Sequence, residues 1–137
     1  MYRKILIWGL LFCLCAVVFG AFGAHALKAF VSQDKLQIFE TGVRYQFLHG
    51  IALIALSIYG NQHKVNWGEQ KILGWAGHFF IIGTLFFSGS LYLLTLLTST
   101  SYPMTRILGP ITPLGGLCFI LGWAFWIREV FVHKVDK

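Results

Sequence analysis

The segment ILGWAGHFFIIGTLFFSGSLYLLTLL, Ile72–Leu97, contains no Asp, Glu, Lys or Arg. About 20 mostly apolar residues are enough for a helix to cross a bilayer, and lipid leaves a backbone no hydrogen-bond partners except its own. Three further apolar stretches occupy Ile5–Gly23, Phe47–Tyr59 and Ile107–Ile127. We therefore predict an all-α, four-helix transmembrane bundle. Its spans are residues 5–23, 41–60, 72–97 and 107–127, within one integral membrane domain of residues 1–137.

The composition supports a membrane protein. Hydrophobic residues make up 57% of the chain and charged residues 12%, whereas soluble domains are about 45–50% apolar and about 25% charged. The formal net charge is +6, but the basic residues lie at the ends of the apolar stretches and form no tract. Such a distribution is typical of topology signals and of contacts with anionic lipids. We expect membrane lipids as partners, and no nucleic acid, because a nucleic-acid-binding domain needs a clustered basic face.

Basic residues are divided unequally between the two ends of the predicted bundle. Four spans place both termini on one side, together with the loop between the second and third spans. That side carries Arg3, Lys4, Lys64, Lys71, Arg128, Lys134 and Lys137, and the other side carries Lys28, Lys35, Arg44 and Arg106. The positive-inside rule therefore predicts that both termini are cytoplasmic.

The connection between the first two spans is predicted to contain an amphipathic helix over residues 34–45. Leu36, Phe39 and Val43 follow the three-to-four-residue spacing of one helix face. The opposite face is polar and includes Glu40 and Arg44. We expect this helix to lie at the membrane surface and to turn into the second span.

Polar residues at the ends of the spans should converge on one half of the bundle. The first and third spans end, and the second and fourth begin, at the same membrane surface. Glu40 and Arg44 have the helical spacing of an ion pair and are the predicted central pair. Ionisable groups at membrane depth are costly and often functional. The candidate polar or ligand-binding cluster is His25, Lys28, Glu40, Arg44, Tyr45, His49, Ser88, Ser90, Tyr92 and Thr112.

The cluster has several interpretations. It is either a structural network that fixes the amphipathic helix to the bundle, or a site for a lipid, small molecule or partner protein. An oligomeric channel or transporter is an alternative, although the inner half offers little polarity besides His78. A membrane enzyme with Glu40 or His49 as a base is a further alternative. The chain has no P-loop, GxSxG, HExxH or CxxC motif, so we predict no enzyme and no catalytic residue.

Other features concern packing and ligands. Ala16, Gly20 and Ala24 form a small-xxx-small pattern, which favours a compact bundle or a homo-oligomer. Pro110 and Pro113 are expected near the first turn of the fourth span, where proline is tolerated. The three cysteines lack metal-type spacing with histidine, and we predict neither a metal nor a cofactor. They are Cys13, Cys15 and Cys118.

Four motifs together resemble those of a known family. They are GAFGAHAL at Gly20–Leu27, ETGVRYQFLH at Glu40–His49, LFFSGSLY at Leu85–Tyr92 and GPITPLGG at Gly109–Gly116. In this order they resemble the YgdD-like family of small inner-membrane proteins, also called domain of unknown function 423 and related to eukaryotic transmembrane protein 256. The resemblance covers nearly the whole chain. It implies a multi-pass protein of the bacterial cytoplasmic membrane and supplies no biochemical activity.

Overall fold

The computed structural model describes residues 2–62, 67–97 and 102–135, and this part of the chain is almost entirely helical. Its elements, in chain order, are α1 (Tyr2–His25), a short 3-10 helix η1 (Leu27–Ala29), α2 (Gln33–Gln62), α3 (Trp67–Leu96) and α4 (Tyr102–Val135). The prediction of an all-α four-helix fold is therefore confirmed. Two of the basic residues used for the topology prediction, Lys64 and Lys137, lie outside the described residues.

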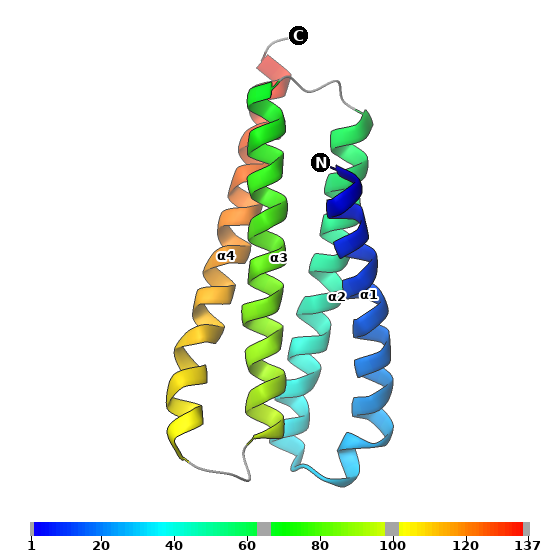
Figure 1. Cartoon of the computed structure of the whole chain (residues 1–137), viewed down its shortest axis with the longest axis vertical. Coiled ribbons are helices and arrows are strands. Elements are labelled where there is room, and N and C mark those ends of the chain that lie inside the picture. The colour runs from blue at the N-terminus through cyan, green and yellow to red at the C-terminus, as the bar shows by residue number, and fades with distance from the viewer. Residues whose placement is uncertain (1, 63–66, 98–101, 136–137) are drawn as a thin grey trace.

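The helices pack in the order of the chain, with α2 and α3 at the centre (Figure 1). α1 packs mainly on α2, and α4 packs mainly on α3. Only 22% of the most apolar window of α1 and 17% of that of α4 are buried, against 39% for α3. The two outer helices thus present broad apolar faces to their surroundings.

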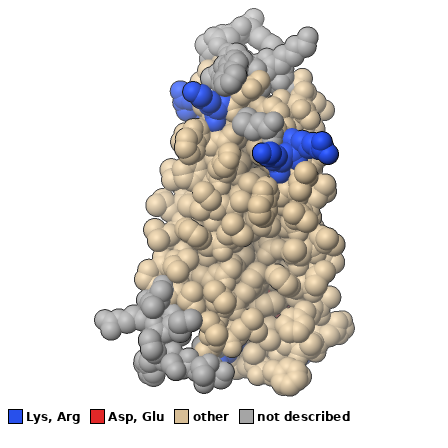
Figure 2. All heavy atoms as spheres, viewed as in Figure 1, with Lys and Arg blue, Asp and Glu red and all other residues tan. Residues whose placement is uncertain are grey.

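Within the described ranges, three helical stretches are long and apolar enough to cross a membrane, at Tyr2–Ala29, Gln70–Leu96 and Leu108–Val132. α2 has similar length and runs beside them, but its first half is polar (Figure 1). Figure 2 shows a broad uncharged belt on one face, with Lys and Arg gathered mainly toward the end where the termini lie. This arrangement is the one expected of a bundle surrounded by acyl chains.

The amphipathic segment 34–45 is not a separate surface helix, because it forms the first turns of the continuous helix α2. Leu36 and Phe39 are buried and pack with Leu27, while Val43 lies against the same cluster. The predicted apolar face is therefore real, but it turns toward the bundle. The helix does not break because this apolar face stays in phase with the buried face of the following span.

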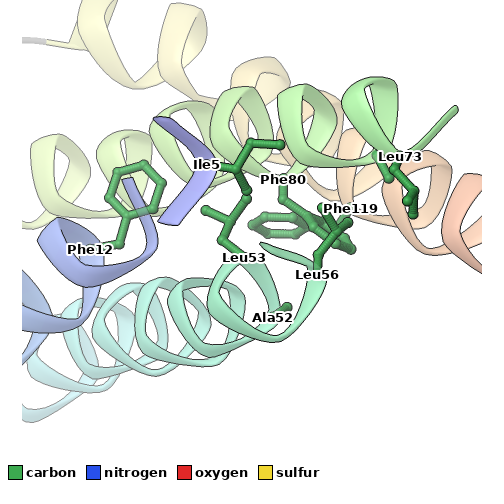
Figure 3. Packing of buried hydrophobic residues seen from close by; sticks show 9 residues of the cluster. Ile5, Phe12, Ala52, Leu53, Leu56, Leu73, Phe80 and Phe119 are labelled. Carbon is green, nitrogen blue, oxygen red and sulfur yellow. The ribbon is translucent and has the colours of Figure 1, made fainter. Parts of the chain in front are cut away.

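The centre of the bundle is an apolar core to which all four helices contribute (Figure 3). Leu53 and Leu56 of α2 and Leu73 and Phe80 of α3 are fully buried. Ile5 and Phe12 reach this core from α1, and Phe119 reaches it from α4. The core ties the outer helices to the central pair.

Glycines set the closest approach between α1 and α2. A Cβ atom at Gly9 would lie 2.8 Å from the Gly50 carbonyl oxygen, and one at Gly50 would lie 2.7 Å from Cys13 Sγ. The small residues of α1 that are buried are Gly9, Ala16 and Gly23, spaced by seven. The predicted pattern of Ala16, Gly20 and Ala24 was therefore wrong in phase, because Ala24 is exposed.

The start of α4 also differs from the prediction. The helix begins at Tyr102, so Pro110 and Pro113 lie inside it and not at its first turn. The bounds predicted for the fourth helix were those of the apolar stretch, and α4 extends beyond that stretch at both ends.

Candidate functional site

The structure divides the ten candidate residues into two groups. His25, Lys28, Glu40, Arg44 and Tyr45 are exposed, whereas the other five lie wholly or partly inside the bundle. Those five are His49, Ser88, Ser90, Tyr92 and Thr112. The predicted convergence therefore holds for these five residues and not for the charged ones.

Glu40 and Arg44 do not join the buried group. Both lie to one side of the buried stripe of Leu36 and Phe39, and both side chains are exposed. Within the described ranges, neither forms an ion pair, so they are not the centre of a polar network. Glu40 and His49 are nine residues apart, about two and a half helical turns, and so lie on opposite faces of α2. An enzyme that uses both on one reacting atom is excluded by this placement.

Ser88 and Tyr92 of α3 bond to α2. Ser88 Oγ donates to the Gly42 carbonyl oxygen at 2.8 Å, and Tyr92 Oη donates to Gln46 Oε1 at 2.8 Å. Gln46 Nε2 in turn donates to the Phe12 carbonyl oxygen of α1 at 3.0 Å. One buried amide thus connects three helices.

Gln46 was absent from the candidate cluster, although it is only 4% exposed. A signal for it exists in the sequence, since it lies three residues after Val43 and three before His49, on the inward phase of α2. A polar residue on that phase must be buried.

Ser90 and Thr112 connect α3 to α4. Their hydroxyl oxygens lie 2.7 Å apart, and Ser90 Oγ also donates to the Phe87 carbonyl oxygen at 2.9 Å. Thr112 is therefore the donor in the pair. This hydrogen bond fixes the N-terminal half of α4 against α3.

His49 is the member of the cluster whose hydrogen bonding is incomplete. Its Nδ1 lies 2.9 Å from the Tyr45 carbonyl oxygen, so Nδ1 carries the proton and donates. The ring stacks on Phe119 of α4 with 3.5 Å between centroids and 11° between planes, and Phe80 and Trp123 lie beside it. His49 is 6% exposed, and its buried Nε2 has no hydrogen-bond partner among the residues that the structure describes. In the neutral ring this atom is an acceptor in an aromatic surrounding.

A groove of about 550 Å³ lies between α2 and α4, with part of α3 behind it. It opens on the outside of the bundle, because Trp123 is 43% and Ile120 66% exposed. Its lining is Tyr45, His49, Phe87, Pro113, Gly116, Leu117, Phe119, Ile120 and Trp123. Of the ten candidate residues, Tyr45 and His49 line this groove.

Glu129 is a second buried polar residue that the predicted cluster did not include. Its side chain is fully buried in α4. It lies on the seven-residue repeat of the buried positions Leu108, Gly115 and Gly122, which is a signal that the sequence contains. Within the described part of the chain, no three His, Cys, Asp or Glu residues gather as metal ligands.

Comparison with known proteins gives a consistent family. Residues 19–116 match the family described as protein of unknown function (DUF423). A UPF0382 membrane protein of Staphylococcus haemolyticus is 40% identical over 94% of this chain and 96% of its own length. The UPF0382 membrane protein YwdK of Bacillus subtilis is 37% identical over 88% of this chain and 90% of its own.

No solved structure matches the chain. The relatives are named as membrane proteins, and the helices described above are long and apolar enough to agree with that name. The resemblance found in the four motifs is thus confirmed across most of the chain. The protein belongs to the DUF423 family of membrane proteins of unknown function.

Proposed function

We propose that this protein is a non-enzymatic component of the bacterial cytoplasmic membrane that binds an uncharged amphiphile with a hydroxyl group. The ligand would lie in the groove between α2 and α4 and donate a hydrogen bond to His49 Nε2. Two observations support the proposal: His49 lines a groove that opens on the outside of the bundle, and its buried Nε2 has no partner within the described ranges.

The chemistry of His49 favours a hydroxyl over other groups. Because Nδ1 donates to the Tyr45 carbonyl, Nε2 of the neutral ring can only accept. A buried acceptor without a partner costs about 1–3 kcal/mol. A ligand hydroxyl would remove that cost, whereas an ester carbonyl or an ether oxygen would add a second acceptor.

The groove favours an apolar body next to that hydroxyl. Its volume of about 550 Å³ is within the roughly 300–1,000 Å³ of small-molecule sites. Phe87, Phe119 and Trp123 supply aromatic walls, and Pro113 and Leu117 complete an apolar lining. A molecule already dissolved in the bilayer could enter sideways without crossing water.

A channel is less well supported by the packing. The described core between the two ends contains Leu53, Leu56, Leu73 and Phe80, all fully buried. The two hydroxyls at the same depth are satisfied by backbone, since Ser57 donates to the Tyr2 carbonyl oxygen and Thr84 to that of Phe80. Apart from His49, which lies beside Phe80, the described residues at this depth thus offer little polarity to replace the water around a moving ion.

The orientation is part of the proposal. The excess of basic residues at the end with the termini favours cytoplasmic N- and C-termini. His25 and Lys28 would then lie on the outer side, and the groove would open to the bilayer between the midplane and the outer surface.

A pair of photoreactive probes tests the binding site. The full chain in phosphatidylcholine nanodiscs is labelled either with a diazirine fatty alcohol or with its methyl ether, and the labelled peptides are mapped by mass spectrometry. We expect the alcohol to label residues 113–123 and 45–49 about threefold to tenfold more than the ether, which corresponds to one net hydrogen bond.

Matched variants identify the cause. His49→Phe keeps a ring to stack on Phe119 but should abolish the difference between the probes, whereas His25→Phe, at an exposed position, should preserve it. Ile120→Trp fills the groove without replacing His49 and should reduce labelling by both probes. Equal labelling by alcohol and ether in the native protein would refute the proposal.

A further inference from the structure

His78 has an unusual place for a histidine in an apolar helix. It lies inside the span Gln70–Leu96, and its side chain is exposed on the outside of the bundle. Ionisable residues in membrane helices almost always face the protein interior or a water-filled cavity. His78 Nδ1 lies 2.6 Å from the Gly74 carbonyl oxygen of its own helix. Nε2 is therefore the atom left for a partner outside the described chain.

Lys71 and Trp75 share this outward face of α3. Together with Gly74 and His78 they line a shallow hollow of about 250 Å³. Lys71 lies two helical turns from His78, roughly 10 Å along the axis, toward the N-terminus of α3. Trp75, which is 58% exposed, lies between them. The face thus offers a cation, an amphipathic aromatic ring and an imidazole at increasing depth.

The depth of this face corresponds to the headgroup region. The apolar span of α3 begins at Gln70, so Lys71 is at its edge. Lysines at such positions extend the ammonium group to the interface, and tryptophan prefers the same layer. Lys and Arg gather toward this end of the bundle (Figure 2), which is the cytoplasmic end in the topology proposed above.

Two occupants could cover the face, a lipid or a second copy of the chain. A twofold contact between parallel copies would bring the same surface of each copy together. It would place two Lys71 ammonium groups against each other, which is unfavourable at the edge of a low-dielectric region. A phosphate group meets Lys71 with opposite charge. The charge on this face therefore selects a lipid.

We propose that Lys71, Trp75 and His78 form a binding site for an anionic phospholipid of the cytoplasmic leaflet. The Lys71 ammonium group donates to the phosphate, Trp75 packs along the glycerol region, and His78 Nε2 provides the deepest polar contact. This site lies on α3, apart from the groove between α2 and α4, and it does not depend on the function proposed there.

Fluorescence quenching by brominated lipids tests the site. The full chain is placed in phosphatidylcholine vesicles that contain phosphatidylglycerol, with bromine on the acyl chains of one lipid or the other. The contribution of Trp75 is the difference between the native protein and Trp75→Phe. We expect brominated phosphatidylglycerol to quench Trp75 preferentially, and Lys71→Gln to reduce this preference about fivefold, the effect of one cation near the surface.

The control variant is Arg128→Gln, which removes another exposed cation that the topology puts at the same end. It should leave the preference intact, while His78→Phe should lower it. Equal quenching of Trp75 by both lipids would overturn the proposal, as would an equal loss in Arg128→Gln and Lys71→Gln. If neither lipid quenches Trp75, a second copy covers the face and the proposal is also wrong.

Discussion

Replacing Gln46 by leucine should destabilise the bundle, because one buried amide joins three helices. The substitution removes the hydrogen bond from Gln46 Nε2 to the Phe12 carbonyl oxygen of α1. It also removes the acceptor of the Tyr92 hydroxyl of α3. The Phe12 carbonyl keeps its place in its own helix, but the half-buried Tyr92 hydroxyl loses a partner at 2.8 Å.

The expected loss follows from these two contacts. Side-chain hydrogen bonds in membrane proteins contribute about 0.6 kcal/mol on average and up to about 1.7. A buried donor left without a partner costs about 1–3 kcal/mol. We expect Gln46→Leu to lower the free energy of unfolding by about 2–4 kcal/mol and Tyr92→Phe by about 1–2 kcal/mol. The double variant should lose about 1 kcal/mol less than the sum, because the second substitution removes a group that is already unpaired.

Reversible unfolding in mixed micelles with a denaturing detergent, followed by circular dichroism, measures these values. Gln46→Leu combined with Ser90→Ala is the matched control, because Ser90 bonds between α3 and α4 and shares no partner with Gln46. That pair should be additive within about 0.5 kcal/mol. If Gln46→Leu and Tyr92→Phe are equally additive, the buried network is not a coupled unit and the reasoning fails.

Three further substitutions test packing and charge. Gly50→Ala should lower the free energy of unfolding by about 1–3 kcal/mol, because the added carbon meets Cys13 and the α1 backbone. Gly89→Ala, where the added carbon has nothing within 4 Å, should be neutral or slightly stabilising. Equal unfolding free energies for the two variants would contradict the described α1–α2 contact. Glu40→Ala should change the unfolding free energy by less than about 0.5 kcal/mol, because Glu40 is exposed and has no ion pair with Arg44; a loss above about 1.5 kcal/mol would place Glu40 back in the network.

The fold could be predicted because three apolar stretches are long, and length together with composition identifies a membrane helix. The stretch Ile72–Leu97 corresponds to α3 within a few residues. The ends of the helices were harder to predict, because a helix continues into water wherever its packing or its helix propensity allows. α4 thus runs from Tyr102 to Val135, well beyond the apolar stretch. α2 joins the amphipathic segment to its span because no residue between them breaks the helix.

The candidate site was predicted in part, because topology fixes the depth of a residue but not the direction of its side chain. Ser88 and Thr112 share a depth, and in the structure Ser88 bonds to α2 and Thr112 bonds to α3. Glu40 was placed at the same depth, but its phase on α2 turns it outward. Gln46 and Glu129 are on inward phases and were missed. A prediction that combines depth with helical phase would have separated these residues.

Phase and depth together also indicate where a ligand could act. Ser88 and Gln46 face inward and have partners from neighbouring helices, so their polarity serves the bundle. His49 faces inward at the level where α2 and α4 are separated by side chains and not packed backbone to backbone. Its Nδ1 is satisfied within α2, and its Nε2 is not. A leucine at this position would pack without a polar group to satisfy. An imidazole at this position therefore adds an unsatisfied acceptor to the described chain, which a donor entering the groove would satisfy in the function proposed above.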